Sequence, residues 1–266
     1  MHILQLTCAA ADKDLLIARL WELDTFGVHE NELPGFRWEL HAWFAEPFQT
    51  AEFEDFQPFW REEAERDWVA IARSRWEPLC VGKKFYLTPE WHAGTAPEGR
   101  LRLVSRPGMA SGSGYQPSTQ LVLEAMEDVV LPQDYVLDVG TGSGILAAAA
   151  CLLGAAGVIA CDIDPDAAAI ARQNLRQDGF RVPVFAGSPR SLRSCCAGLV
   201  LANLNAAALS SSAAELARAA RPRSRLIVSG FRILRETPVL SRLRAHGFRP
   251  MARRERETWV CLTLER

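Results

Sequence analysis

The sequence has few groups that could bind a metal or cross-link the chain. Its 266 residues include seven cysteines, an odd number, with no C-x-x-C pair. Five scattered histidines complete no zinc-binding pattern. Cys195 and Cys196 are adjacent, a spacing that suits neither a shared metal nor an ordinary disulfide. We therefore expect no metal site, and we expect free thiols in a reducing cytoplasm.

Signals for export or for membrane insertion are also weak. The opening segment MHILQLTCAAADKD lacks a basic region, and its apolar run is too short for a signal peptide. Val139 to Cys161 contains no charged residue and is long enough to resemble a membrane span. However, this stretch begins with a G-x-G-x-G turn and is bounded by Asp138 and Asp162. A strand, a turn, a buried helix and a second strand explain it better, so no membrane association is expected.

Charge and tryptophan are distributed unevenly along the chain. Residues 1–100 contain 18 acidic against 10 basic side chains, and seven of the eight tryptophans precede residue 92. The remainder carries a net charge of about +6, because the whole chain carries −2. This contrast indicates two domains. The acidic half argues against direct nucleic-acid binding and suits a basic protein partner, or else it is a solvated acidic surface.

The first part of the chain is typical of a small α+β domain. Residues 2–8 alternate as a strand, and residues 11–25 have helical spacing. Two further strands, 27–33 and 36–45, flank the turn signal Pro34-Gly35. An amphipathic helix is expected over 59–75 and a short strand over 83–87. We place this domain at residues 1–91 and a linker at 92–104.

From residue 105 to 266 the pattern predicts an α/β domain of alternating strands and helices. Repeated βαβ units indicate a parallel sheet covered on both faces. The expected strands are 135–140, 157–162, 181–186, 198–203 and 225–230, the expected helices are 145–153, 206–220 and 235–246, a further helix begins at Asp164-Pro165, and 248–255 with 259–265 forms a closing hairpin.

The turn between the first strand and helix of this domain carries three glycines. Gly140, Gly142 and Gly144 permit a tight turn and close approach of a ligand to the backbone. Asp162 ends the next strand, where an acid can accept hydrogen bonds from two ribose hydroxyls. The G-x-G-x-G spacing, with Asp138 before it, suits the ammonium and sulfonium of S-adenosylmethionine better than the pyrophosphate of NAD. A tight turn without a ligand is the structural alternative.

Asn203 ends a later strand, GLVLAN, at the same edge of the sheet. Its side-chain carbonyl, with nearby backbone carbonyls, can accept hydrogen bonds from an amine and hold the nitrogen lone pair toward a methyl group. Alternatively, Asn203 caps the following helix.

Together these segments resemble the PrmA family, the methyltransferases that modify ribosomal protein L11. The similarity covers about residues 76–264. It runs through WEPLCVGKKFYLTPEW, PGMASGSGYQPST, VLDVGTGSGILAAAA, DIDPDAAAIARQN, LVLANL, LIVSGF and TWVCLTL. The glycine-rich segment Pro107–Thr119, joined to the DVGTGSG turn, is specific to this family, whereas the turn alone indicates only a methyltransferase.

The resemblance implies a Rossmann-like class I methyltransferase domain and an N-terminal domain that docks a basic ribosomal protein. By matching position it assigns the contacts to S-adenosylmethionine to Thr119, Gly140, Asp162 and Asn203. The segment Pro107–Thr119 is then expected to close over the cofactor and line the methyl-transfer channel. The family usually reads close to GTG-x-H-x-TT in this segment. Here Gln116 stands in place of the histidine, and Ser118 in place of the first threonine.

The reaction implied is transfer of methyl groups to lysine or N-terminal amines. We expect Asn203 and the carbonyl of Leu204 to orient the amine, with Gln116 nearby, and Trp259 either to wall the channel or to pack in the core. Other hypotheses remain open: a methyltransferase for another protein or a small-molecule amine, a non-catalytic S-adenosylmethionine-binding protein, and a nicotinamide oxidoreductase. An RNA acceptor is disfavoured because no basic tract with interleaved aromatics is present.

Overall fold

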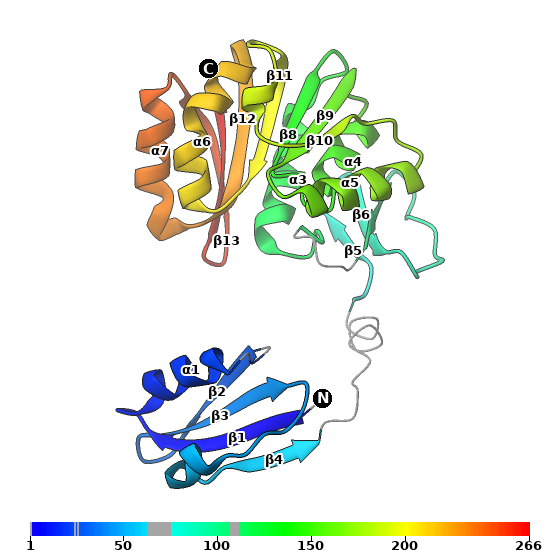
Figure 1. Cartoon of the computed structure of the whole chain (residues 1–266). Coiled ribbons are helices and arrows are strands. Elements are labelled where there is room, and N and C mark those ends of the chain that lie inside the picture. The colour runs from blue at the N-terminus through cyan, green and yellow to red at the C-terminus, as the bar shows by residue number, and fades with distance from the viewer. Residues whose placement is uncertain (1, 24, 26, 63–75, 107–111) are drawn as a thin grey trace. The chain divides into compact units, whose positions relative to one another are not determined.

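The computed structural model describes residues 2–23, 25, 27–62, 76–106 and 112–266. The chain divides into two compact units, Met1–Ile71 and Ala72–Arg266 (Figure 1). This division precedes the linker predicted at residues 92–104. That glycine- and proline-rich segment instead lies inside the second unit, where it connects two strands and includes the start of the second one.

The first unit is a four-stranded antiparallel sheet packed against one helix. Along the chain it comprises β1 (His2–Ala9), α1 (Lys13–Glu22), β2 (Gly27–Leu33), β3 (Arg37–Phe44), the 3₁₀ turn η1 (Ala51–Phe56) and β4 (Phe59–Glu62). The strands lie in the order β2-β3-β1-β4. Alternate side chains of β1, such as Leu4 and Leu6, pack with Leu16 and Leu20, which lie four residues apart on one face of α1. The sequence predictions for β1, α1, β2 and β3 are confirmed.

The helix predicted over residues 59–75 is wrong at its start. Residues 59–62 form β4, which pairs with β1, and residues 63–75 lie outside the described part of the chain. Trp60 packs edge-on against Phe44 and Phe48, with ring centroids 5.7 and 5.1 Å apart. In the sheet, β1 lies between β3 and β4 and pairs with both. The helical spacing of the aromatic residues carries no information on this strand pairing.

The second unit begins with a three-stranded sheet. It consists of β5 (Leu79–Val81), β6 (Phe85–Pro89) and β7 (Leu101–Ser105), in the order β5-β6-β7. β6 and β7 are parallel. The predicted strand at 83–87 therefore begins later and ends later than expected.

The remainder of the second unit is a seven-stranded sheet with helices on both faces. The elements are α3 (Pro117–Val129), β8 (Tyr135–Val139), α4 (Ile145–Leu152), β9 (Gly157–Asp162), α5 (Pro165–Gln177), β10 (Val184–Ala186), η2 (Pro189–Ser191), β11 (Ala197–Asn203), α6 (Ala206–Ala219), β12 (Ala220–Arg232), η3 (Ile233–Arg235), α7 (Glu236–Ala245), β13 (Arg249–Arg256) and β14 (Trp259–Glu265). The strand order is β10-β9-β8-β11-β12-β14-β13. The first five strands in this order are parallel, and β14 and β13 form the predicted antiparallel closing hairpin.

Two apolar cores hold the helices to the sheet. Helices α3, α4 and α5 lie on one face, and α6 and α7 lie on the other (Figure 1). Buried side chains of each group form a separate apolar cluster with the strands. The run of alanines in α4 is buried throughout, which explains the long uncharged stretch in the sequence. Strand order changes direction between β8 and β11, and ligands of open α/β sheets bind at such a switch point.

Candidate functional site: a cavity at the switch point of the sheet

A cavity of about 570 Å³ opens at the carboxyl ends of β8, β9 and β11. Ten of the residues singled out from the sequence line it: Gln116, Ser118, Thr119, Gly140, Gly142, Asp162, Asp164, Asn203, Leu204 and Trp259. Segments that are far apart along the chain thus meet at one edge of the sheet. Asp138 and Gly144 do not line the cavity.

The glycine turn after β8 has the backbone that its sequence predicts. Gly140, Gly142 and Gly144 have φ values of +69°, +54° and +86°, in the left-handed region that favours glycine. A Cβ on Gly140 would lie 2.2 Å from Leu204 Cδ2. Glycine at this position therefore leaves room for the side chain of Leu204, the first residue after β11. A Cβ on Gly144 would lie 3.3 Å from the backbone of Ala171, so Gly144 lets α4 begin against α5.

Asp162 ends β9 and holds the glycine turn in place. The N–H of Gly142 donates to Asp162 Oδ2 at 2.9 Å, and the N–H of Asp164 donates to Oδ1 at 3.1 Å. Because the two carboxylate oxygens together accept about four hydrogen bonds, the side chain retains acceptor capacity toward the cavity. Asp164 caps α5 by accepting a hydrogen bond from the N–H of Asp166, as its position before Pro165 predicted.

Asn203 is fixed by Thr119, which comes from the first turn of α3. Its Nδ2 donates to Thr119 Oγ1 at 3.0 Å, while its buried Oδ1 has no hydrogen-bond partner among the described residues. The alternative that Asn203 caps the next helix does not hold, because Asn205 caps α6 by accepting from the N–H of Ala208. Asn203 therefore lines the cavity and has a buried carbonyl oxygen that no described residue uses.

Asp138 lies beneath the turn and is completely buried. Thr141 Oγ1, which belongs to a residue lining the cavity, donates to Asp138 Oδ2 at 2.6 Å. Burial raises the pKa of Asp138 to about 6; the hydrogen bond from Thr141 and the amide of Ala147 oppose this rise, and the charge of Asp162 adds to it.

The described part of the first glycine-rich segment packs against the cofactor turn predicted from the sequence. Ser143 Oγ donates to the carbonyl of Gly112 at 2.6 Å. Gly114 has φ +90°, and a Cβ there would lie 2.7 Å from Ile145 Cδ1. Gln116 precedes α3 and is exposed at the cavity. Residues 107–111 lie outside the described part of the chain, so the predicted closure of this segment is left as an expectation.

Trp259, at the start of β14, has both of the roles that the sequence left open. It lines the cavity and also packs against the core beneath α3 and α4. The guanidinium of Arg232 lies 5.4 Å from the centre of its ring, on the neighbouring strand β12.

Sequence reasoning missed two residues that shape the site. Ser143 links the turn to Gly112, as described above. Gly230 lines the cavity with φ +90°, and a Cβ there would lie 2.5 to 2.8 Å from backbone atoms of Leu204. The signal for Gly230 is present in the segment LIVSGF, where a glycine interrupts a buried strand.

No group of three or more His, Cys, Asp or Glu side chains could hold a metal ion among the described residues. All seven cysteines belong to the described part, and none of them forms a disulfide. No described helix has both the length and the apolar character needed to cross a membrane.

The strand order, the glycine turn after β8 and the cavity at the switch point define the Rossmann-like fold of class I methyltransferases. The family model described as ribosomal protein L11 methyltransferase (PrmA) matches residues 40–266. The chain belongs to this family. The match begins well before residue 76, where the resemblance seen in the sequence began.

Individual relatives agree with this assignment. The chain is 38% identical over 202 residues to a ribosomal protein L11 methyltransferase of Burkholderia cenocepacia, which covers 76% of this chain and 66% of that protein. A relative from Burkholderia mallei is 37% identical with the same coverage. The chain thus spans just under two thirds of the length of these curated relatives. The solved ribosomal protein L11 methylase of Lactobacillus delbrueckii superposes with a TM-score of 0.67 at 26% identity, covering 72% of this chain and 99% of that one.

Proposed function

We propose that this chain transfers methyl groups from S-adenosylmethionine to lysine or N-terminal amines of a ribosomal protein of the L11 type. The relatives supply the substrate class, since they are named as L11 methyltransferases. The observation that carries the proposal is the cavity-lining residue Asn203, at the carboxyl edge of the sheet, whose buried carbonyl oxygen has no hydrogen-bond partner among the described residues. The excess of acidic residues before residue 100 suits a basic protein partner rather than a nucleic acid, and we expect the enzyme to act in the cytoplasm.

The side chains present fit S-adenosylmethionine. Asp162, with its spare acceptor capacity, would accept hydrogen bonds from the ribose hydroxyls. The positive φ angles of Gly140 and Gly142 allow a ligand to approach the backbone closely. When bound, the cofactor supplies a methyl group on a sulfonium, which is already activated for displacement.

The chain's own contribution is to orient the acceptor amine. Asn203 Oδ1 and the carbonyl of Leu204 would accept hydrogen bonds from the amine and turn its lone pair toward the methyl group. Gln116 lies at the same cavity and would contact the acceptor side. Because a displacement of this kind depends mainly on alignment, positioning is expected to supply most of the rate enhancement.

The amine must reach this site without its proton. The only carboxylates lining the cavity among the described residues are Asp162 and Asp164. Asp162 accepts from the N–H groups of Gly142 and Asp164, and Asp164 accepts from the N–H of Asp166 at the start of α5. Loss of the proton at pH 7 costs about 1 kcal/mol for an N-terminal amine and about 4–5 kcal/mol for a lysine. Water would therefore take the proton, and an apolar closed site would lower the pKa of a lysine.

Intact-protein mass spectrometry tests this proposal. The purified chain, S-adenosylmethionine and ribosomal protein L11 from the same genome are mixed, and gains in whole-methyl steps on L11 are expected. Asn203→Ala should reduce transfer about a hundredfold, because it removes the acceptor for the amine. Asn205→Ala is the matched control, since its carbonyl oxygen is already used by the helix cap. Absence of methyl gain with bound cofactor would refute the substrate, and equal activity of the two variants would refute the role of Asn203.

A further inference from the structure

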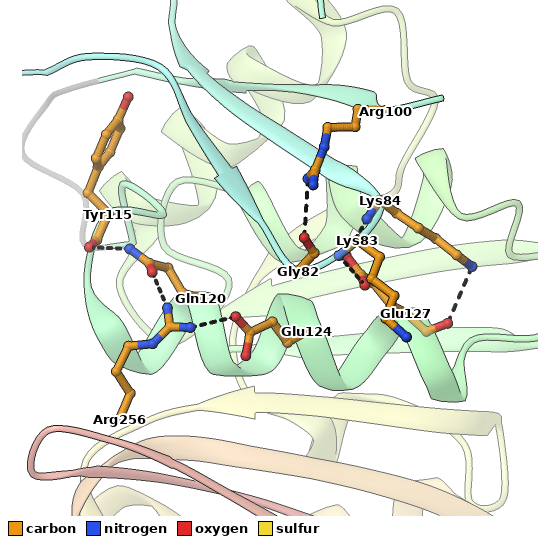
Figure 2. Close-up of polar contacts among 9 residues, drawn as sticks. All are labelled: Gly82, Lys83, Lys84, Arg100, Tyr115, Gln120, Glu124, Glu127 and Arg256. Atoms are coloured by element: carbon orange, nitrogen blue, oxygen red, sulfur yellow. Dashed lines mark hydrogen bonds and ion pairs between the residues drawn. The ribbon is translucent and has the colours of Figure 1, made fainter. Parts of the chain in front are cut away.

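Polar side chains of α3 form hydrogen bonds and an ion pair with two other parts of the second unit (Figure 2). Toward its C-terminus, the carboxylate of Glu127 accepts hydrogen bonds from the N–H groups of Lys83 and Lys84, each at 2.8 Å. These lie in the turn between β5 and β6. Closer to the N-terminus of α3, Arg256 at the end of β13 donates to Gln120 Oε1, and to Glu124 Oε1 at 2.7 Å.

Gln120 also forms a hydrogen bond with the glycine-rich segment Pro107–Thr119. Its Nε2 donates to the carbonyl oxygen of Tyr115 at 2.9 Å (Figure 2). A guanidinium can only donate and a backbone carbonyl can only accept, so the two neighbours together fix which way the amide of Gln120 points. Arg256 therefore sets the direction in which Gln120 donates.

Tyr115 is held at its ring as well as at its carbonyl. Its hydroxyl donates to the carbonyl of Glu77 at 3.0 Å, and its ring stacks on Trp76 with centroids 4.9 Å apart. The next residue is Gln116, which lines the cavity. The carbonyl of Gln116 accepts from the N–H groups of Thr119 and Gln120, and Ser113 Oγ donates to its Oε1 at 3.4 Å. The anchoring of Tyr115 adds a constraint on Gln116 from the preceding residue.

The same arginine is also the cross-strand neighbour of a second cavity-lining residue, Trp259. Arg256 is paired with Trp259 across the hairpin of β13 and β14, which places both side chains on the same face of the sheet. Trp259 lines the cavity. Arg256 therefore links the hairpin of β13 and β14, which contains Trp259, to the segment that contains Gln116. The link runs through Gln120, which bonds both Arg256 and Tyr115.

We propose that Gln120, oriented by Arg256, is a positioning residue that sets the place of Gln116 on the acceptor side of the cavity. This inference rests on the proposed function, because it assigns the acceptor amine to that side. Gln120 does not line the cavity and is not a catalytic residue. Its contribution is to the alignment of acceptor and methyl group, to which displacement reactions are highly sensitive.

Two reciprocal substitutions on α3 separate positioning from simple helix support. Gln120→Glu keeps an acceptor for Arg256 but removes the donor to Tyr115 and places an oxygen against its carbonyl. Glu127→Gln weakens the other attachment of the same helix, which does not contact Tyr115. Gln120→Met, similar in size, removes both hydrogen bonds and serves if Gln120→Glu folds poorly.

The measurements are hydrogen exchange of residues 112–119, binding of S-adenosylmethionine by calorimetry, and steady-state kinetics with L11. Gln120→Glu should speed exchange in this segment and lower kcat/KM for the acceptor about tenfold, equivalent to about 1.4 kcal/mol. Its affinity for the cofactor should stay within about twofold of the parent value. Glu127→Gln should lower the melting temperature while leaving exchange in the segment and the kinetics unchanged.

Failure of this inference is distinguishable from failure of the proposed function. Hydrogen exchange does not depend on the identity of the acceptor, so it reports on the Gln120 contact even if L11 is not methylated. Unchanged exchange in Gln120→Glu and Gln120→Met would overturn the positioning role. Equal kinetic losses in Gln120→Glu and Glu127→Gln would overturn it too, because they would show that general support of α3 is what matters.

Discussion

Replacing Gly230 by alanine tests whether the backbone at the end of β11 is locked by close packing. A Cβ at this position would lie 2.5 Å from the carbonyl oxygen, 2.7 Å from the nitrogen and 2.8 Å from the carbonyl carbon of Leu204. All three are backbone atoms, so no side-chain rotation relieves the contact. Leu204, which directly follows Asn203 at the end of β11, must therefore move away from its place in the cavity wall.

Gly247 provides a closely matched control. Its φ is +91°, against +90° at Gly230, but a Cβ there would have no other heavy atom within 4 Å. Gly247→Ala should therefore cost only the backbone penalty of about 1–2 kcal/mol for an ordinary residue in the left-handed region. Gly230→Ala adds an overpacking cost of about 1–3 kcal/mol, for a total of about 2–5 kcal/mol.

Thermal unfolding with and without S-adenosylhomocysteine, which identifies the transition of the ligand-binding unit, measures both costs. At about 2–4 °C per kcal/mol for a domain of this size, Gly230→Ala should lower the midpoint by about 4–20 °C and Gly247→Ala by about 2–8 °C. Methyl transfer should fall only in Gly230→Ala. Equal shifts in the two variants, or normal transfer by folded Gly230→Ala, would refute the packing argument.

Two further predictions concern the carboxylates near the glycine turn. Asp162→Asn should weaken binding of S-adenosylmethionine about a hundredfold by calorimetry, because hydrogen bonds to a charged acceptor contribute about 1.5–3 kcal/mol; a change below threefold would contradict the ribose assignment. Asp138 has a pKa of about 6 in the folded chain, above that of an unfolded aspartate, so its ionisation destabilises the fold as the pH rises from 4 to 7. Asp138→Asn should therefore gain about 3 kcal/mol of stability relative to the parent over that range in urea unfolding, and a pH-independent difference between the two proteins would exclude the buried charge as the cause.

Local sequence patterns predicted those elements whose stability is decided locally. The strands ending at Val139, Asp162 and Asn203 are continuous apolar runs, as expected for strands buried on both faces. Asp164-Pro165 defined the start of α5 because capping depends only on adjacent residues. The grouping of the predicted site residues followed from a rule of topology, since carboxyl ends of parallel strands meet at one edge.

Failures of prediction occurred where distant segments decide the structure. The segment Phe59–Glu62 forms a strand because β1 accepts a second partner along its edge, which no spacing of aromatics reveals. Residues 101–104 were included at the end of the linker predicted at 92–104, yet they pair with β6. Likewise, nothing near Gln120 in the sequence indicates Arg256, which lies 136 residues away along the chain.

The hydroxyl of Ser143 connects the two glycine-rich segments, Pro107–Thr119 and the turn after β8. Ser143 belongs to the turn after β8, and it donates to the carbonyl of Gly112 at 2.6 Å, while its own carbonyl accepts from Asn174 on α5. The donor side of the cavity, where the glycine turn lies, is thereby bonded directly to the segment that leads to Gln116. Gln120 holds the other end of that segment at Tyr115. Under the proposed function, these hydrogen bonds would couple the place of the methyl donor to that of the acceptor. The two glycine-rich segments have complementary features: the turn after β8 would let the cofactor approach the backbone, and Gly112 and Gly114 of the other segment pack against that turn and the helix after it.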